Sequence, residues 1–94
     1  MIHRLKCWPE YFAPIKGNTK TFDLRVDDRG FKVGDLLQLQ EWTPELGYTG
    51  KEISKRVTYI LRGPFFNPSH DHISPGLSEG WVILALGDVG DDAL

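Results

Sequence analysis

The chain has 94 residues, of which 40% are hydrophobic and 12% aromatic, so it suits one globular domain and leaves no room for a second. Eleven Lys and Arg against thirteen Asp and Glu give a net charge of −2, whereas a generic polyanion-binding domain is usually basic. The single cysteine, Cys7, excludes an internal disulfide and a cysteine-based zinc site within one chain.

The first predicted elements are a strand over residues 2–6 and a helix of about two turns over residues 8–16. Pro9 suits a first helical turn, and Gly17 suits the stop. Apolar residues recur at three- and four-residue spacing along one face: Trp8, Tyr11, Phe12 and Ile15. Pro14 is expected to shorten or kink this helix, because proline lacks the N–H group that a helix interior uses.

The hydrophobic period then changes from helical spacing to two, which is typical of strands with one buried face. Strands are predicted over residues 21–26, 36–42, 53–62 and 81–86, the last being apolar on both faces as in a central strand. The predicted core contains Phe22, Leu24, Leu37, Leu39, Val57, Tyr59 and Ile83. Residues 63–80 are predicted to form a mobile loop, and residues 87–94 a frayed tail.

These elements predict a mainly β (α+β) domain that occupies residues 1–94. We expect a small, closed or partly closed β-barrel of five or six mostly antiparallel strands with one or two short helices. No apolar run is long enough for a signal peptide or a membrane span. We therefore expect a cytoplasmic protein without a membrane partner.

Four segments of the sequence carry a family resemblance. They are His3-x-Leu5-Lys6 with Trp8-Pro9-x-Tyr11-Phe12, Lys20-Thr21-Phe22-Asp23-Leu24-Arg25, Asp28-Arg29-x-Phe31-x-Val33-Gly34-Asp35, and Tyr48-Thr49-Gly50-Lys51 with the strands that follow. Together they resemble the ASCH branch of the PUA-like superfamily, and within it a small uncharacterised bacterial and phage group. The resemblance implies a β-barrel packed with a helix, and a cleft beside the first helix that suits RNA or a modified nucleoside.

The strand that begins near Lys20 carries the main candidate ligand residues. Lys20 suits a phosphate or carbonyl oxygen, and Arg25 offers a planar fork for phosphate or a base. Asp23 lies on the same strand face as Arg25 and can accept from a base or orient the arginine, with Thr21 beside them. Arg29 is a candidate second clamp at the mouth of the cleft. The same residues also fit a surface ladder of ion pairs, and the resemblance favours a ligand site.

Further candidates lie at both ends of the proposed cleft. His3 and Lys6 can edge it, although the sequence favours a packed, hydrogen-bonded role for His3 over a ligand contact. Trp8 is the candidate base-stacking residue, with Tyr11 and Phe12 assigned to packing. Tyr48 and Thr49 are candidate ligand contacts in a loop, where a plain hairpin turn would look similar.

The sequence predicts neither a metal nor a cofactor. His70-Asp71-His72 has zinc-type residues but no further His or Cys nearby, so it is interpreted as a polar loop tip. Cys7, next to Trp8, is interpreted as a buried and unreactive thiol.

The function favoured by the sequence is binding of RNA or a nucleotide without catalysis, by a monomer or a weak homodimer. One alternative is a small amidohydrolase acting on an acylated cytidine nucleoside, in which Lys20 and Asp23 would be the catalytic residues. A hydrolase needs both a base and an oxyanion donor, and one lysine supplies only one of these at a time. The other alternative is a phage or prophage accessory protein that binds a host protein.

Overall fold

The computed structural model describes residues 1–64 and 76–89. In chain order the elements are β1 (Ile2–Cys7), α1 (Pro9–Lys16), β2 (Phe22–Val26), β3 (Leu36–Thr43), β4 (Gly47–Arg62) and β5 (Trp81–Gly87). The mainly β architecture with one short helix is confirmed. The main difference in length is at β4, which begins at Gly47 instead of Ile53, because it continues into the hairpin that joins it to β3.

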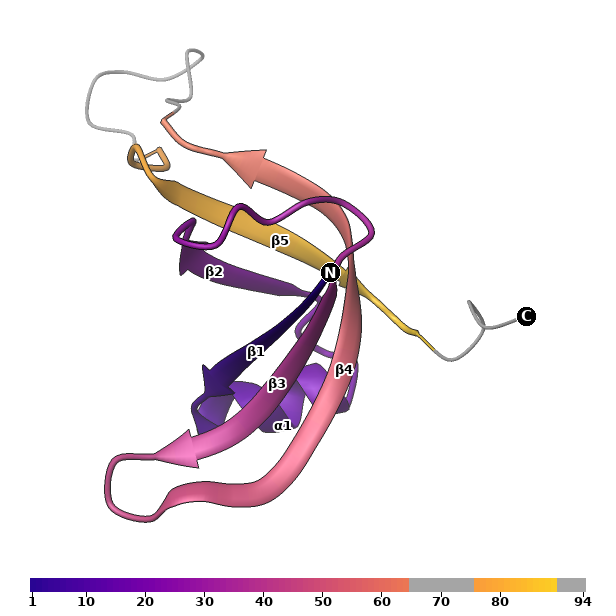
Figure 1. The fold of residues 1–94 in the computed structure, drawn as a ribbon, viewed down its shortest axis with the longest axis vertical. Coiled ribbons are helices and arrows are strands. Elements are labelled where there is room, and N and C mark those ends of the chain that lie inside the picture. Colours follow the sequence, from indigo (N-terminus) through magenta and orange to yellow (C-terminus); the bar gives the residue numbers. More distant parts are fainter. Residues whose placement is uncertain (65–75, 90–94) are drawn as a thin grey trace.

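The five strands form one sheet with the order β1-β3-β4-β5-β2. β1 pairs with β3 in parallel, and the other three pairings are antiparallel. The sheet curls into a half-barrel, so that its two edge strands, β1 and β2, face each other across an opening (Figure 1). Helix α1 follows β1 directly and packs against β3.

Helix α1 runs for eight residues, which confirms the predicted two turns, but it continues through Pro14, so the shortening expected at that proline is wrong. Pro14 removes only the hydrogen bond that its N–H would have donated to the Glu10 carbonyl, and the helix ends two residues later at Lys16. The Pro14 carbonyl accepts hydrogen bonds from the backbone N–H groups of Thr19 and Lys20, at 2.9 and 3.0 Å. These bonds turn the chain out of the helix and into β2.

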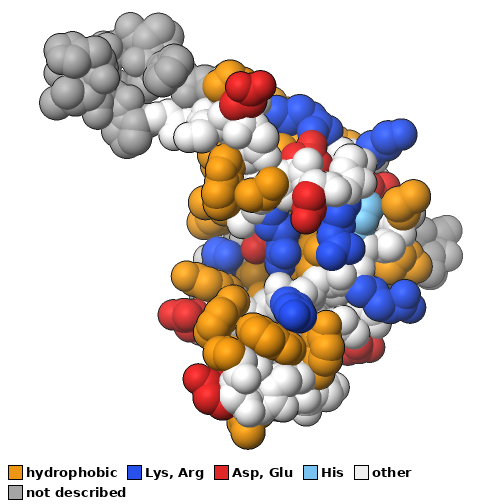
Figure 2. Space-filling view, turned by 60° about the vertical axis from the view of Figure 1, so that its left-hand side comes forward, with side chains coloured by type: hydrophobic (Ala, Val, Ile, Leu, Met, Phe, Trp, Pro, Cys, Tyr) orange, Lys and Arg blue, Asp and Glu red, His pale blue; other side chains and the backbone are white. Residues whose placement is uncertain are grey.

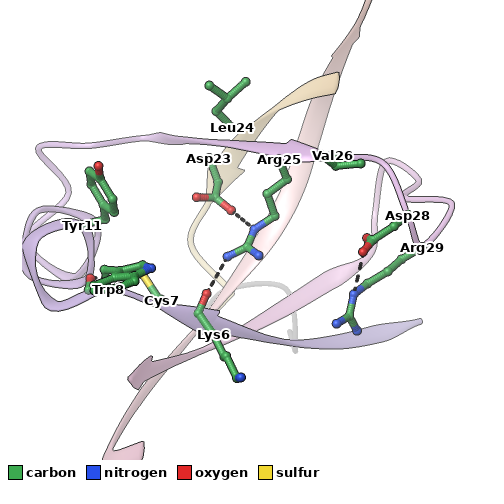
Figure 3. A pocket seen from close by; sticks show the side chains of 10 residues that line it. All are labelled: Lys6, Cys7, Trp8, Tyr11, Asp23, Leu24, Arg25, Val26, Asp28 and Arg29. Carbon is green, nitrogen blue, oxygen red and sulfur yellow. Dashed lines mark hydrogen bonds and ion pairs between the residues drawn. The ribbon is translucent and has the colours of Figure 1, made fainter. Parts of the chain in front are cut away.

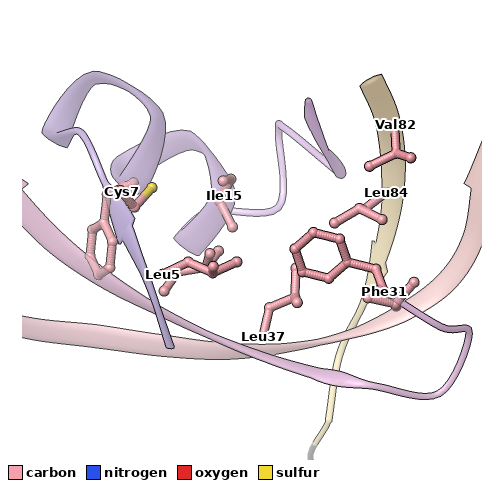
Figure 4. Close-up of a cluster of buried hydrophobic side chains, with 10 residues drawn as sticks. Leu5, Cys7, Ile15, Phe31, Leu37, Val82 and Leu84 are labelled. Carbon is pink, nitrogen blue, oxygen red and sulfur yellow. The ribbon is translucent and has the colours of Figure 1, made fainter. Parts of the chain in front are cut away.

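The core lies inside the curl, between the sheet and α1 (Figure 4). Leu37, Leu39 and Val57 are completely buried, as predicted from the sequence. They are joined by residues from β1, α1, β5 and the turn before β3: Leu5, Cys7, Phe12, Ile15, Phe31, Val82 and Leu84. Cys7 is buried, which confirms its interpretation as a core thiol.

Strand β2 is oriented opposite to the prediction, with its polar face inward. Phe22 and Leu24 are exposed, whereas Asp23 between them is buried. The cause is the register with β5, in which Asp23 pairs with the buried Leu84 and Leu24 pairs with Ile83. Residues directly opposite in an antiparallel pair point to the same side of the sheet. Phe22 and Leu24 therefore do not belong to the core.

Tyr59 and Ile83 were also predicted to lie in the core, and the register of their strands likewise turns both side chains outward. Tyr59 is exposed, and Ile83 is half-buried on the outer side of the sheet. A register irregularity between Val57 and Tyr59 shifts the alternation of β4, so that Val57 points inward and Tyr59 outward. β5 lies between β4 and β2, which confirms its central place.

The two segments predicted to be irregular are described only in part. Gly87 is the last residue of β5 and pairs with Arg56, so the predicted frayed tail does not begin there. Residues 90–94 of that tail and residues 65–75 of the predicted mobile loop, with His70, Asp71 and His72, lie outside the described residues. In the described part of the chain, α1 is too short to cross a membrane.

Candidate functional site

A cavity of about 430 Å³ lies in the opening between β1 and β2. One wall comes from the end of β1 and the start of α1, and the other from β2 and the turn after it (Figure 3). The residues that line it are Lys6, Cys7, Trp8, Tyr11, Asp23, Leu24, Arg25, Val26, Asp28 and Arg29. We call this cavity the seam cleft, because it lies where the half-barrel does not close.

Arg25 bridges the seam cleft. Its Nε donates to the Asp23 carboxylate on the same strand, and its Nη2 donates to the backbone carbonyl of Lys6 on β1, at 2.9 Å (Figure 3). A guanidinium has five N–H groups arranged in a planar fork. Arg25 is therefore held in place from two sides while its remaining N–H groups can reach a ligand.

Asp23 organises the cations of the site. Its side chain is only 9% exposed and lies 3.7 Å from the Lys20 ammonium in addition to its contact with Arg25. A buried carboxylate is stable only when paired, and here two cations pair it. Lys20 also lies over the Tyr11 and Phe22 rings, at 4.8 and 5.1 Å from their centroids. Asp23 thus fixes Lys20 and Arg25 side by side.

Trp8 and Tyr11 form the aromatic wall of the seam cleft. The Trp8 carbonyl accepts the N–H groups of Tyr11 and Phe12, so the first turn of α1 places Trp8 and Tyr11 on one side. Both side chains are close to half exposed, whereas Phe12 points into the core. The expectation that Tyr11 serves packing is therefore wrong. In the sequence, Tyr11 lies beside Phe12 at the edge of the helical apolar stripe. A residue at that edge can face either the core or the cleft, so the pattern alone does not separate the two.

Trp8 packs against Trp42 of β3. The two rings meet edge to face, with centroids 5.7 Å apart. The Lys6 ammonium lies over the Trp42 ring, 4.4 Å from its centroid. In the cleft Lys6 contributes its backbone carbonyl, whereas its ammonium group contacts the Trp42 ring.

Arg29 is placed by the turn after β2. The Asp27 carboxylate accepts hydrogen bonds from the backbone N–H groups of Gly30 and Phe31, at 3.1 and 3.2 Å. Gly30 has a φ of 67°, which glycine adopts without strain. The turn presents Arg29 at the cleft, where its Nε lies 3.8 Å from Asp28 in an exposed pair.

Five sequence candidates do not line the seam cleft. Lys20 is one of them, although it pairs with Asp23 and lies over the Tyr11 ring beside the cleft. His3 is buried and its Nε2 donates to Asp35, 2.8 Å away. Thr49 donates to Glu41 at 2.8 Å, and neither it nor Tyr48 is among the lining residues. The Thr21 backbone carbonyl pairs with β5, and its side chain does not line the cavity.

Cys7 lines the cleft, but its thiol is not activated as a nucleophile. Burial raises the pKa of its thiol above the usual 9.0, and the neighbouring Asp23 charge adds to this rise. The neutral thiol is a poor nucleophile. Within residues 1–64 and 76–89, no three His, Cys, Asp or Glu side chains are grouped to hold a metal ion.

Comparison with known proteins places this chain in a family. Residues 2–86 match the family described as "Domain of unknown function (DUF3850)". The chain belongs to the DUF3850 family. It is also 33% identical over 59 residues to the "Uncharacterized 12.9 kDa protein in GpA 3'region" of Escherichia phage P2. That match covers 63% of this chain and 53% of the phage protein, so this DUF3850 chain spans about half the length of its relative.

Proposed function

We propose that this chain binds single-stranded RNA or a nucleotide in the seam cleft, without chemical turnover. The observation that carries the proposal is the meeting of two exposed aromatic rings, Trp8 and Tyr11, with two guanidinium groups, Arg25 and Arg29, around one cavity. Nucleotides present a planar base and an anionic phosphate, and single-strand binding sites combine aromatic stacking surfaces with cations.

The cations suit a phosphate at the β2 side of the cleft. Arg25 is held by Asp23 and the Lys6 carbonyl, so little side-chain freedom is lost when it binds an anion. Arg29 is more exposed and reaches the same cavity from the following turn. Bidentate contacts from such groups to phosphate are among the stronger hydrogen bonds in proteins.

The charge near the seam cleft differs in sign from the net charge of the whole chain. Residues 1–34 hold seven Lys and Arg against four Asp and Glu, and they supply every residue that lines the seam cleft. Figure 2 shows Lys and Arg side chains gathered near the middle of the face that carries the opening, with hydrophobic groups above and below them. A net charge of −2 is therefore compatible with a cationic site.

The resemblance to ASCH and PUA-like domains supports the same class of ligand, because it implies a cleft beside the first helix. The descriptions of the DUF3850 family and of the phage protein name no ligand. The phage relative is consistent with an accessory protein of phage or prophage origin.

The contacts of Lys20 favour binding over hydrolysis. A lysine that acts as a base must lose its proton, whereas Lys20 lies beside the Asp23 carboxylate and over two aromatic rings, which all suit an ammonium ion. Asp23 is itself engaged by two cations. We therefore assign Lys20 and Asp23 to holding the site in place.

The test is fluorescence anisotropy with a labelled single-stranded RNA, and with nucleotides as competitors, over a range of salt concentrations. The logarithm of affinity should fall with the logarithm of salt at a slope of about −0.7 per phosphate contact. Arg29→Ala and Arg25→Ala should each lower the slope by about one contact, whereas Lys51→Ala on β4 should leave it unchanged.

Trp8→Ala tests the aromatic half of the site separately. It should weaken binding about 5- to 150-fold at every salt concentration without changing the slope, because stacking on a ring involves no phosphate charge. No measurable affinity for RNA or nucleotides at low salt would refute the proposal. Release of acetate from N4-acetylcytidine that depends on Lys20 would replace it with hydrolysis.

A further inference from the structure

The outer face of the sheet is divided into a polar half and an apolar half. Across β3 and the first part of β4 the outward residues are polar, and Gln38 donates to Glu52 at 2.8 Å. Across β2, β5 and the end of β4 they are apolar. Three cross-strand rows make up this apolar outer face: Phe22, Ala85 and Tyr59; Leu24, Ile83 and Leu61; Val26 and Trp81.

The exposure of this face is large for a chain of this size. Leu24 is 49% exposed and Tyr59 is 63% exposed, and Phe22, Val26 and Trp81 expose 40–48%. Because a large apolar or aromatic side chain has an area of roughly 150–250 Å², the face exposes on the order of 500 Å². This lies near the upper end of the apolar patches that monomers carry, about 300–600 Å², and such patches often serve an interaction.

We propose that the apolar outer face packs against the same face of a second copy of this chain. A two-fold interface brings identical surfaces together, so any charge at its centre would oppose its own copy. The eight residues of this face carry no charge, and the face is therefore self-complementary. Its exposed area of about 500 Å² is smaller than the roughly 800 Å² per partner of a standard interface, so we expect a weak dimer.

Pairing through this face is compatible with an accessible seam cleft. Asp23 and Arg25 lie on the inner face of β2, opposite to Phe22, whereas Leu24 and Val26 belong to the apolar outer face and also line the edge of the seam cleft. A second sheet stacked on the outer face lies about 10 Å from the first. The dimer proposal rests on the apolar outer face alone and does not require the proposed ligand.

The test is the mass of the purified chain in solution, measured by sedimentation equilibrium over a range of concentrations. We expect a concentration-dependent mass that rises toward twice the 10.7 kDa of one chain. Tyr59→Glu and Leu61→Glu should each raise the dimer dissociation constant more than about 100-fold, because each introduces an unpaired charge into an apolar interface.

Matched controls separate the face from general surface effects. Tyr59→Phe keeps the face apolar and should still dimerise, and Leu46→Glu places the same charge on an 80% exposed residue outside the face and should have no effect. Far-UV circular dichroism confirms that the glutamate variants are folded. A parent chain that stays monomeric at the highest concentrations, or a dimer that survives both glutamate substitutions, would overturn the proposal and point to a different partner or surface.

Discussion

Two buried carboxylates, Asp23 and Asp35, show how single residues fix this small domain. Asp23 is paired by Lys20 and Arg25 at the seam cleft. Asp35 accepts hydrogen bonds from His3 at 2.8 Å and from the backbone N–H of Lys32 at 3.0 Å, and it lies 3.3 Å from the amino group of Met1. Each carboxylate has several partners, as a buried charge needs, and Asp35 in this way joins the start of β1 to the start of β3.

Asp35 is expected to make stability depend on acid pH. Desolvation raises the pKa of Asp35, but the hydrogen bonds from His3, Lys32 and the Met1 amino group outweigh it and hold the pKa below 3.8. The ionised form therefore stabilises the fold above pH 3.8, and this contribution is lost as the pH falls through the lowered value. Asp35→Asn should reduce the free energy of unfolding by about 1–3 kcal/mol at neutral pH.

Urea denaturation at several pH values measures this effect. The difference between Asp35→Asn and the parent should shrink as the pH drops below 3.8, whereas the exposed Asp28→Asn should follow the parent throughout. A difference that stays constant into acid would show that the carboxylate charge is not the cause.

At the scale of elements, β2 buries the face that was predicted to be exposed and exposes the face that was predicted to be buried. Its polar residues face the interior, where they form the site, and its apolar residues form part of the outer face. An edge strand permits this arrangement, because an inward-pointing side chain such as Arg25 can bury its aliphatic part while its charged end reaches the opening of the curl. The same strand thus serves the seam cleft on one side and the apolar outer face on the other.

Paired leucine substitutions test this orientation. Leu39→Ala should lower the free energy of unfolding by about 2–5 kcal/mol, because Leu39 is fully buried in the core. Leu24→Ala should change it by less than about 1 kcal/mol, because Leu24 is half exposed. Chemical denaturation, with both variants at one low protein concentration, measures the two values. Equal large losses would place Leu24 in the core after all.

At the scale of the whole molecule, Lys55 links parts of the chain that no strand pairing joins. Its buried ammonium lies 2.6 Å from Asn18 Oδ1, between α1 and β2, and 2.7 Å from Asp88 Oδ1, just after β5. Lys55 and Arg25 are two of the side chains that hold the half-barrel together. Arg25 spans the open seam, and Lys55 anchors the far side of α1 to the end of the sheet.

Replacement of Lys55 tests how much this second link contributes. Lys55→Ala should lower the free energy of unfolding by about 1–3 kcal/mol, through lost packing of the buried aliphatic chain and the lost hydrogen bonds. Lys55→Met keeps most of the packing and should cost less. Asp88→Asn should have a small effect, since the Asp88 side chain is 72% exposed. Thermal unfolding of the three variants compares them, and equal stability of Lys55→Ala and the parent would contradict a structural role.

Local patterns in the sequence were sufficient for the elements and for much of the site. Hydrophobic spacing and turn residues located α1 and all five strands. Residue chemistry together with the family resemblance singled out Asp23, Arg25, Arg29 and Trp8, which line one cavity. Tertiary structure decided which face of β2 and of the end of β4 points inward, that Tyr11 belongs to the cleft, and that His3 pairs with Asp35 away from it. Alternation along a strand distinguishes its two faces, but only the register with neighbouring strands and the curl of the sheet determine which face becomes the interior.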